Sequence, residues 1–245
     1  MRRLLTTALV ATALVLTGCG GEDTVKVESK PAEKAAEKVT AGKNLQAEIV
    51  HASFFGGDDD ALTRFAVKIT NPENKTRVGA TAEWRALDKD GVLVGTHTKE
   101  LPPIPAKGTW YYVGGAGSVL LTGLPAKIQL EITNNGSLVS GGNKSVVTVE
   151  KAEFKKSEYD LTPGQKEYDV TAVIAVHSEV KTENINTSVL LLDKKGKVVG
   201  ADWLDLDSLP EQLKAGEKVR VQATVYLSES ANTPKEIKAF VTAAN

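Results

Sequence analysis

Few residues of this 245-residue chain are of the types that catalysis or metal binding requires. Cys19 is the sole cysteine, so the chain can form neither an internal disulfide nor a thiolate metal cluster. The histidines, His51, His97 and His177, are far apart and have no ligand-spaced partner. Neither a Gly-x-Ser-x-Gly nor a His-Glu-x-x-His motif occurs. The sequence therefore predicts no enzyme, no metal site and no cofactor.

The residues before Cys19 indicate what its thiol does. Arg2 and Arg3 provide a positive start, and residues 4–16 are mostly apolar but too few to span a bilayer. The tetrapeptide Leu16-Thr17-Gly18-Cys19 that ends this run resembles the lipobox of bacterial lipoproteins. The resemblance implies that residues 1–18 are a removed signal peptide and that Cys19 carries palmitate and other acyl chains.

Such an anchor would determine where the protein works. Two or more acyl chains hold a protein stably on a membrane. We therefore expect the protein to be anchored on the extracytoplasmic face of the cell membrane. Gly20 follows the cysteine, which resembles an outer-membrane destination in a two-membrane organism. Loss of Arg2 and Arg3 leaves 28 of the 30 basic residues against 31 acidic ones, a formal charge of −3. This balance argues against nucleic acid as a partner.

The rest of the chain divides into a spacer and a strand-rich region. Residues 19–43 have almost no large apolar side chains and are typical of a flexible tether. From about residue 44, apolar and polar residues alternate, as in 62–70, 126–133 and 218–226. Alternation of this kind, bounded by Gly, Pro, Asn and Asp, predicts short half-buried strands and an all-β fold.

The strand-rich region looks like one unit repeated twice. The segments that correspond are 51–54 with 151–154, 84–95 with 189–200, and 125–128 with 234–237. A period near one hundred residues predicts two tandem immunoglobulin-like β-sandwich domains. We place them at residues 44–140 and 141–245.

Both copies contain a hairpin motif with a glycine at its end. Asp88-Lys89-Asp90-Gly91 and Asp193-Lys194-Lys195-Gly196 place glycine where a tight turn needs a positive φ. The second motif and the later Leu213-Lys214-Ala215-Gly216-Glu217 resemble FxLYD-type immunoglobulin-like modules of bacterial surface lipoproteins. The first copy departs from this pattern, because Pro105-Ala106-Lys107-Gly108-Thr109 lacks the glutamate. The resemblance implies extracytoplasmic, mostly non-catalytic modules.

Trp110-Tyr111-Tyr112 is the densest aromatic cluster of the chain. On a strand, Trp110 and Tyr112 share one face and Tyr111 takes the other. In one interpretation, Trp110 and Tyr112 form a ligand or partner surface that stacks a sugar or peptide beside the glycine-rich loop 114–118. In the other, one face packs in the core and the opposite face packs on the neighbouring domain.

The chain has two acidic stretches, and the first is a further candidate for a partner surface. Asp58, Asp59 and Asp60 could contribute to a calcium site or form a solvated loop, and the lack of alternate acidic spacing favours the loop. Asp202, Asp205 and Asp207 beside Trp203 are predicted to place charge on an edge strand and oppose aggregation.

Together these patterns predict a membrane-anchored, extracytoplasmic and non-catalytic lipoprotein. Its expected partners are membrane lipid, through Cys19, and an envelope protein or cell-wall component that it binds or scaffolds. The alternative is a receptor lipoprotein that binds a glycan or a peptide or serves a transporter.

Overall fold

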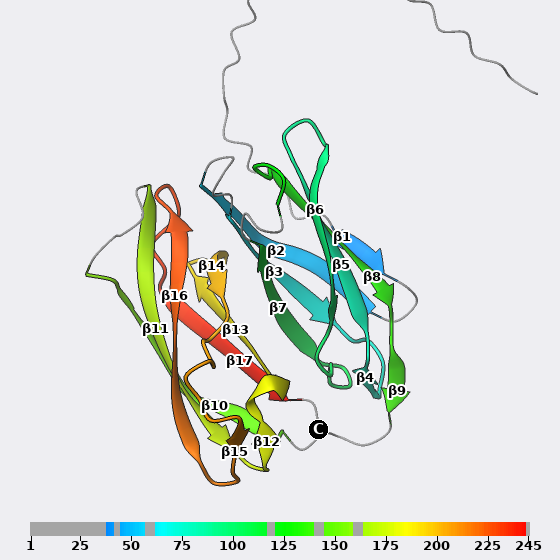
Figure 1. Ribbon diagram of the computed structural model, residues 1–245, viewed down its shortest axis with the longest axis vertical. Coiled ribbons are helices and arrows are strands. Elements are labelled where there is room, and N and C mark those ends of the chain that lie inside the picture. Colours follow the sequence, from blue (N-terminus) through cyan, green and yellow to red (C-terminus); the bar gives the residue numbers. More distant parts are fainter. Residues whose placement is uncertain are drawn as a thin grey trace, which may run out of the picture. The chain divides into compact units, whose positions relative to one another are not determined.

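A computed structural model describes residues 38–41, 45–56, 62–116, 121–139, 145–158 and 164–243 (Figure 1). Most of these residues are in strands and none is in an α-helix, so the predicted all-β fold is confirmed. The elements are β1 (Lys38–Ala41), β2 (Leu45–Phe55), β3 (Leu62–Thr70), β4 (Thr76–Val78), β5 (Thr81–Leu87), β6 (Leu93–Glu100), β7 (Thr109–Ala116), β8 (Lys127–Asn134), β9 (Ser137–Val139), β10 (Val147–Lys156), β11 (Gln165–Val176), β12 (Val180–Lys181), a 3-10 turn (Thr182–Asn184), β13 (Ile185–Leu192), β14 (Val198–Asp202), β15 (Gln212–Leu213), β16 (Lys218–Ser228) and β17 (Glu236–Ala243).

The first half of the described chain, up to residue 139, is a sandwich of two main sheets. Their strand orders are β1-β2-β3-β7 and β6-β5-β8, and β4 pairs separately with β9. Alternate residues of both sheets point inward to one apolar cluster, in which Trp84 and Phe65 are almost fully buried and meet edge to face at 5.8 Å. The period-two pattern of the sequence therefore produces a core between facing sheets.

The second half, residues 145–243, repeats this arrangement. Its sheets have the orders β10-β11-β16 and β14-β13-β17, with β12 paired to β15. A separate apolar cluster fills the space between them and includes Val170, Ile174 and Val225. Strands β2-β3-β7 and β6-β5-β8 thus correspond in order to β10-β11-β16 and β14-β13-β17. The two halves of the described chain therefore share one strand order.

Both hairpin motifs adopt the predicted turn. Gly91 and Gly196 have φ values of 84° and 76°. Each aspartate closes its turn in the same way: Asp88 Oδ1 accepts from the backbone N of Asp90 and Val92 at 2.9 and 2.8 Å, and Asp193 Oδ1 accepts from the backbone N of Lys195 and Lys197 at 2.8 and 3.1 Å. The sequence motif therefore encodes a side-chain-capped turn in each copy.

A third apolar cluster, the joining cluster, contains residues from both halves. Its buried members are Ala66, Val113, Leu190, Leu192, Val198 and Ala201, and Val50, Tyr111 and Phe240 pack against them. Strands β3, β7, β13 and β14 are consequently apolar on both faces, as the unbroken run Val189–Leu192 illustrates. The described residues belong to one compact unit, and the boundary near residue 140 stays a prediction.

Two details differ from the expected segment limits. β1 pairs with β2 in antiparallel register, Lys38 opposite Glu48 to Ala41 opposite Leu45, within the range predicted as tether. Gly114 and Gly115, expected in a loop, are part of β7 and lie opposite Phe65 and Arg64 of β3. In the part of the chain that the structure describes, no helix is long and apolar enough to cross a membrane.

Candidate functional site

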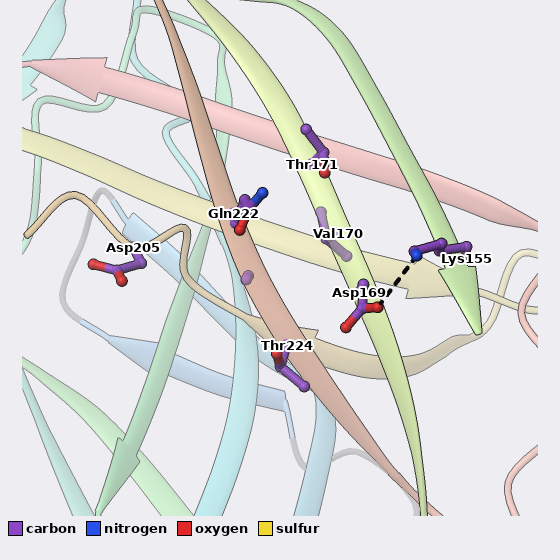
Figure 2. Close-up of a pocket in the computed structure, with 8 residues that line it drawn as sticks. Lys155, Asp169, Val170, Thr171, Asp205, Gln222 and Thr224 are labelled. Atoms are coloured by element: carbon purple, nitrogen blue, oxygen red, sulfur yellow. Dashed lines mark ion pairs between the residues drawn. The ribbon is translucent and has the colours of Figure 1, made fainter. Parts of the chain in front are cut away.

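A polar groove lies on the outer face of the sheet β10-β11-β16 (Figure 2). Its volume is about 470 Å³, within the range of roughly 300–1,000 Å³ that small-molecule sites have. Strands β10, β11 and β16 contribute most of the wall, and a segment that follows β14 contributes one residue. The lining residues are Lys155, Asp169, Val170, Thr171, Asp205, Gln222, Ala223 and Thr224.

Strand alternation places these polar side chains on the outer face. Tyr168, Val170 and Ala172 of β11 point into the core, so Asp169 and Thr171 between them point outward. In the antiparallel register Asp169 lies opposite Thr224 and Thr171 lies opposite Gln222. Polar residues of neighbouring strands thus stand side by side across the sheet, as Figure 2 shows.

Asp205 provides the remaining wall of the groove. Its backbone N–H donates to the Gln222 carbonyl at 2.7 Å, so the segment after β14 runs along the edge of β16. Leu204, the residue before Asp205, is held by Thr187, whose hydroxyl accepts a hydrogen bond from the Leu204 N–H at 2.9 Å. The Leu204 side chain is buried, and those of Trp203 and Asp205 on either side of it are exposed.

The groove offers hydrogen bonds of both kinds. Asp169 and Asp205 are acceptors when ionised, Lys155 is a donor, and Thr171 and Gln222 can donate and accept. Lys155 Nζ and Asp169 Oδ2 are 3.9 Å apart, and their side chains are 68% and 42% exposed, so this pair is weak and open to a ligand. Among the described residues no group of three His, Cys, Asp or Glu side chains could hold a metal ion. The arrangement suits the binding of a polar ligand.

An aromatic and charged cluster, here called the rim cluster, consists of Arg64, Asp202, Trp203 and Tyr226, and its Trp203 precedes Asp205 by two residues. Arg64 Nε donates to Asp202 Oδ2 at 3.2 Å, and the guanidinium lies 4.5 Å from the centre of the Trp203 ring. Asp202 Oδ1 accepts from the Trp203 N–H at 2.9 Å. The Trp203 ring is therefore held on one face by a cation, although the residue is 42% exposed.

The pKa directions agree with this geometry. Burial raises the pKa of Asp202, against the lowering effect of Arg64. Burial also raises the pKa of Tyr226, and the charges of Glu167 and Asp202 raise it further, whereas Arg64 lowers it. Tyr226 is the member of the rim cluster that lies two residues beyond Thr224, on the same outward face of β16.

His51 lies where β2 meets β14. Its Nε2 is buried and has no hydrogen-bond partner among the described residues. The pKa of the imidazole is lowered to about 4, mainly by burial. The Lys197 charge also lowers it, and a hydrogen bond with the Val198 backbone opposes both effects. The ring is therefore neutral near pH 7. The other histidines are exposed, His97 against the Trp84 ring at 5.9 Å and His177 bonded to Thr148 at 2.8 Å.

The structure packs both faces of the predicted aromatic cluster. Trp110 is 6% exposed and belongs to the first core, against which Tyr112 also packs. Burial raises the pKa of Tyr112 to about 12. Tyr111, on the opposite face, stacks on Phe240 with ring centres 4.9 Å apart. Trp110 and Tyr111, on opposite faces of β7, thus both pack against other side chains, as the second interpretation of the sequence expects.

The adjacent glycines serve packing. A Cβ on Gly114 would lie 2.3 Å from the Phe65 ring, so the glycine lets that ring fill the core. A Cβ on Gly115 would lie 2.7 Å from an Arg64 guanidinium nitrogen. The second glycine thus leaves room for the side chain that reaches Asp202.

The remaining predicted sites lie outside the described residues. These are the lipobox residues Leu16, Thr17 and Gly18, the lipidation residue Cys19, and the acidic residues Asp58, Asp59 and Asp60. The sequence analysis did not identify the groove or Arg64. The sequence predicts edge charge at Asp202 and Asp205; Asp205 is exposed, but Asp202 is buried and paired with Arg64. Alternation along β16 was the one signal that could have placed Gln222 and Thr224 outward.

Comparison with known proteins gives little further information. No family model and no curated protein matches the chain. Among solved structures it is similar to red sea bream transglutaminase, with 14% identity over 81% of this chain and 28% of that one and a TM-score of 0.25. It is also similar to exo-chitosanase CsxA of Amycolatopsis orientalis, with 15% identity over 73% of this chain and 25% of that one and a TM-score of 0.19. The chain spans less than a third of the length of either protein, and likenesses this distant carry no argument about activity.

Proposed function

We propose that this protein is a lipoprotein that is anchored on the outer side of a membrane through Cys19 and binds or scaffolds another envelope component without catalysis. The tetrapeptide Leu16-Thr17-Gly18-Cys19 at the end of a short apolar run is the observation that carries the proposal. An extracytoplasmic chain with one lipidated cysteine has no disulfide, so its stability depends on its apolar cores. Two large apolar clusters and the joining cluster supply this need.

Metabolic labelling with an alkyne analogue of palmitate tests the anchor. The wild-type chain should carry the label and sediment with membranes, whereas Cys19→Ser should lose the label because serine cannot form the thioether. Thr17→Ser is the matched control, because it changes the lipobox but keeps the thiol, and it should retain the label. An unlabelled wild-type chain, or equal label on Cys19→Ser, would refute the anchor.

A second candidate function, a receptor that binds a small or extended ligand, is favoured by the polar groove. The groove has the volume of a ligand site and combines donors, acceptors and an exposed tryptophan nearby. Scaffolding and ligand binding are compatible in one lipid-anchored protein. Saturable binding of a purified ligand would distinguish a receptor from a scaffold, which would instead capture a protein partner.

A further inference from the structure

The polar groove differs from an ordinary solvated sheet face because a further segment, which carries Asp205, lines it at the edge of β16. On a plain outer face, polar side chains of β10, β11 and β16 would project into open water. Here the Asp205 N–H is bonded to the Gln222 carbonyl, which fixes a second segment along the edge of β16. The result is a concave surface in which side chains from four segments converge on one volume.

The chemistry of the groove matches sugar hydroxyl groups. A hydroxyl donates one hydrogen bond and accepts others, so it can satisfy both an ionised carboxylate and an amide or ammonium donor. Asp169 and Asp205 supply acceptors, Lys155 supplies donors, and the Gln222 side chain supplies both. Hydrogen bonds with a charged partner are the stronger kind, and the groove has three charged groups available for them.

The rim cluster adds the flat apolar surface that a pyranose ring needs. Arg64 covers one face of the Trp203 indole at 4.5 Å, and the residue is still 42% exposed. Cation stacking fixes the ring before any ligand arrives, which reduces the entropy lost on binding. Tyr226 contributes a second aromatic side chain on the outward face of β16 beyond Thr224. Trp and Tyr combine an apolar body with a polar tip, and the C–H faces of sugars stack on such rings.

Other ligand classes fit less well. A peptide that adds a strand needs a free sheet edge, and the β16 edge at Gln222 is already bonded to Asp205. The groove lining also lacks the apolar pockets that peptide side chains fill. Its two carboxylates exceed its single ammonium, so phosphate-rich polymers and other polyanions would be repelled.

We propose that the polar groove, together with Trp203 and Tyr226, binds a neutral oligosaccharide. One terminal unit of the oligosaccharide would stack on Trp203. The hydroxyls of the adjoining units would bond to Asp205, Gln222, Thr171 and Asp169. The proposal deepens the binding part of the proposed function but is independent of the anchor. Failure of acyl labelling would leave it intact, and failure of sugar binding would leave the anchor intact.

Calorimetry and saturation-transfer NMR on the full chain in detergent test the proposal with three neutral probes, cellohexaose, maltohexaose and N-acetylchitohexaose. We expect at least one to bind with a Kd below about 1 mM. Trp203→Ala and Gln222→Ala should each weaken that binding by about tenfold or more. Gln222 is exposed on its strand, so its truncation should keep the fold, which the melting temperature verifies.

Thr98→Ala is the matched control, because Thr98 is exposed on β6 in the first half and should leave binding unchanged. Absence of binding for all three probes at about 5 mM overturns the proposal. Wild-type affinity in the Gln222→Ala and Trp203→Ala variants also overturns it. If none of the sugars binds but a polyglutamate or hexalysine peptide does, and Gln222→Ala abolishes the binding of that peptide, the groove belongs to a different ligand class and the proposal is wrong.

Discussion

Arg64 of β3 and Asp202 at the end of β14 form an ion pair, Nε to Oδ2 3.2 Å, between residues 138 positions apart in the chain. Their side chains are only 15% and 8% exposed, so both charges are largely removed from water. The pair stands beside the joining cluster, and Trp203 covers the guanidinium. The contact therefore fixes one half of the described chain against the other through charge as well as apolar packing.

Removal of Arg64 should destabilise the protein. In Arg64→Met, Asp202 stays in its buried position without a partner, and its pKa, already raised by burial, should rise further. We expect a loss of about 2–4 kcal/mol in the free energy of unfolding, measured by urea titration at pH 7. Combining Arg64→Met with Asp202→Asn should recover part of the loss, because no unpaired charge then remains.

The exposed pair Lys181–Glu183 provides the comparison. Its atoms are also 3.2 Å apart, but the side chains are 66% and 71% exposed. Lys181→Met should therefore change the free energy of unfolding by less than about 0.5 kcal/mol. Equal losses in Arg64→Met and Lys181→Met would show that burial of the Arg64 pair has no energetic consequence.

Stability should fall in mild acid because of His51. Burial lowers the pKa of the folded imidazole from 6.5 to about 4. Between these values the unfolded chain takes up a proton that the folded chain does not, so the contribution is complete above pH 6.5 and is lost as the pH falls to 4. The expected loss is about 1.4 kcal/mol per pH unit, and up to about 3 kcal/mol in all.

The difference between wild type and His51→Gln isolates this effect. Two other groups affect the acid response and are present in both proteins. Burial raises the pKa of Asp202, so acidification changes the stability through Asp202 in the opposite direction, and Lys197 faces His51. Urea titrations at pH 7 and pH 4.5 should show a smaller acid loss in His51→Gln. Identical slopes for wild type and His51→Gln would contradict the burial of a neutral imidazole.

Gly114 should not accept a side chain. A Cβ there would approach the Phe65 ring at 2.3 Å, and Phe65 is held by Trp84 and Tyr112 on either side. Gly114→Ala should therefore cost about 1–3 kcal/mol through overpacking, read as a lower urea midpoint. Gly123→Ala is the control, because its Cβ would meet only a Val94 methyl at 3.4 Å. A Gly114→Ala variant as stable as Gly123→Ala would mean that the Phe65 ring can move away.

Local patterns of the sequence predicted the fold well. Alternation along residues 62–70 and 218–226 corresponds to β3 and β16, and the glycines of both hairpin motifs have the positive φ that their turns require. Such features depend on residues a few positions apart, for which strand geometry and turn chemistry suffice. The repeat then extended the prediction from one half to the other.

The groove and the joining cluster could not be predicted in the same way. Asp169, Asp205 and Gln222 meet because the segment after β14 pairs with β16, and no spacing rule connects them. Trp110 and Tyr112 were predicted as a possible ligand surface, but Trp110 is buried in the first core and Tyr112 packs against that core. Phe240 from the other half packs on Trp110 and Tyr111. One signal was available: the unbroken apolar run Val189–Leu192 is typical of a strand that is buried on both faces.

Asn71 should be essential to the first sandwich, because its buried amide links its own loop to the segment at Ile104 and Pro105. Its Nδ2 donates to the carbonyls of Lys75, Ile104 and Pro105 at 2.9, 3.1 and 3.1 Å, and its Oδ1 accepts from the Glu73 N–H at 3.1 Å.

Asn71→Ala would leave these backbone groups without the amide in a place that water reaches poorly, so we expect a loss of about 2–4 kcal/mol in urea titration. Asn186→Ala removes an amide with a single 3.5 Å bond and should cost under about 1 kcal/mol. Asn71→Leu separates shape from hydrogen bonding: it keeps a similar branched shape but has neither donor nor acceptor. Its loss should approach that of Asn71→Ala if the three carbonyls, and not the packing of the side chain, determine the stability.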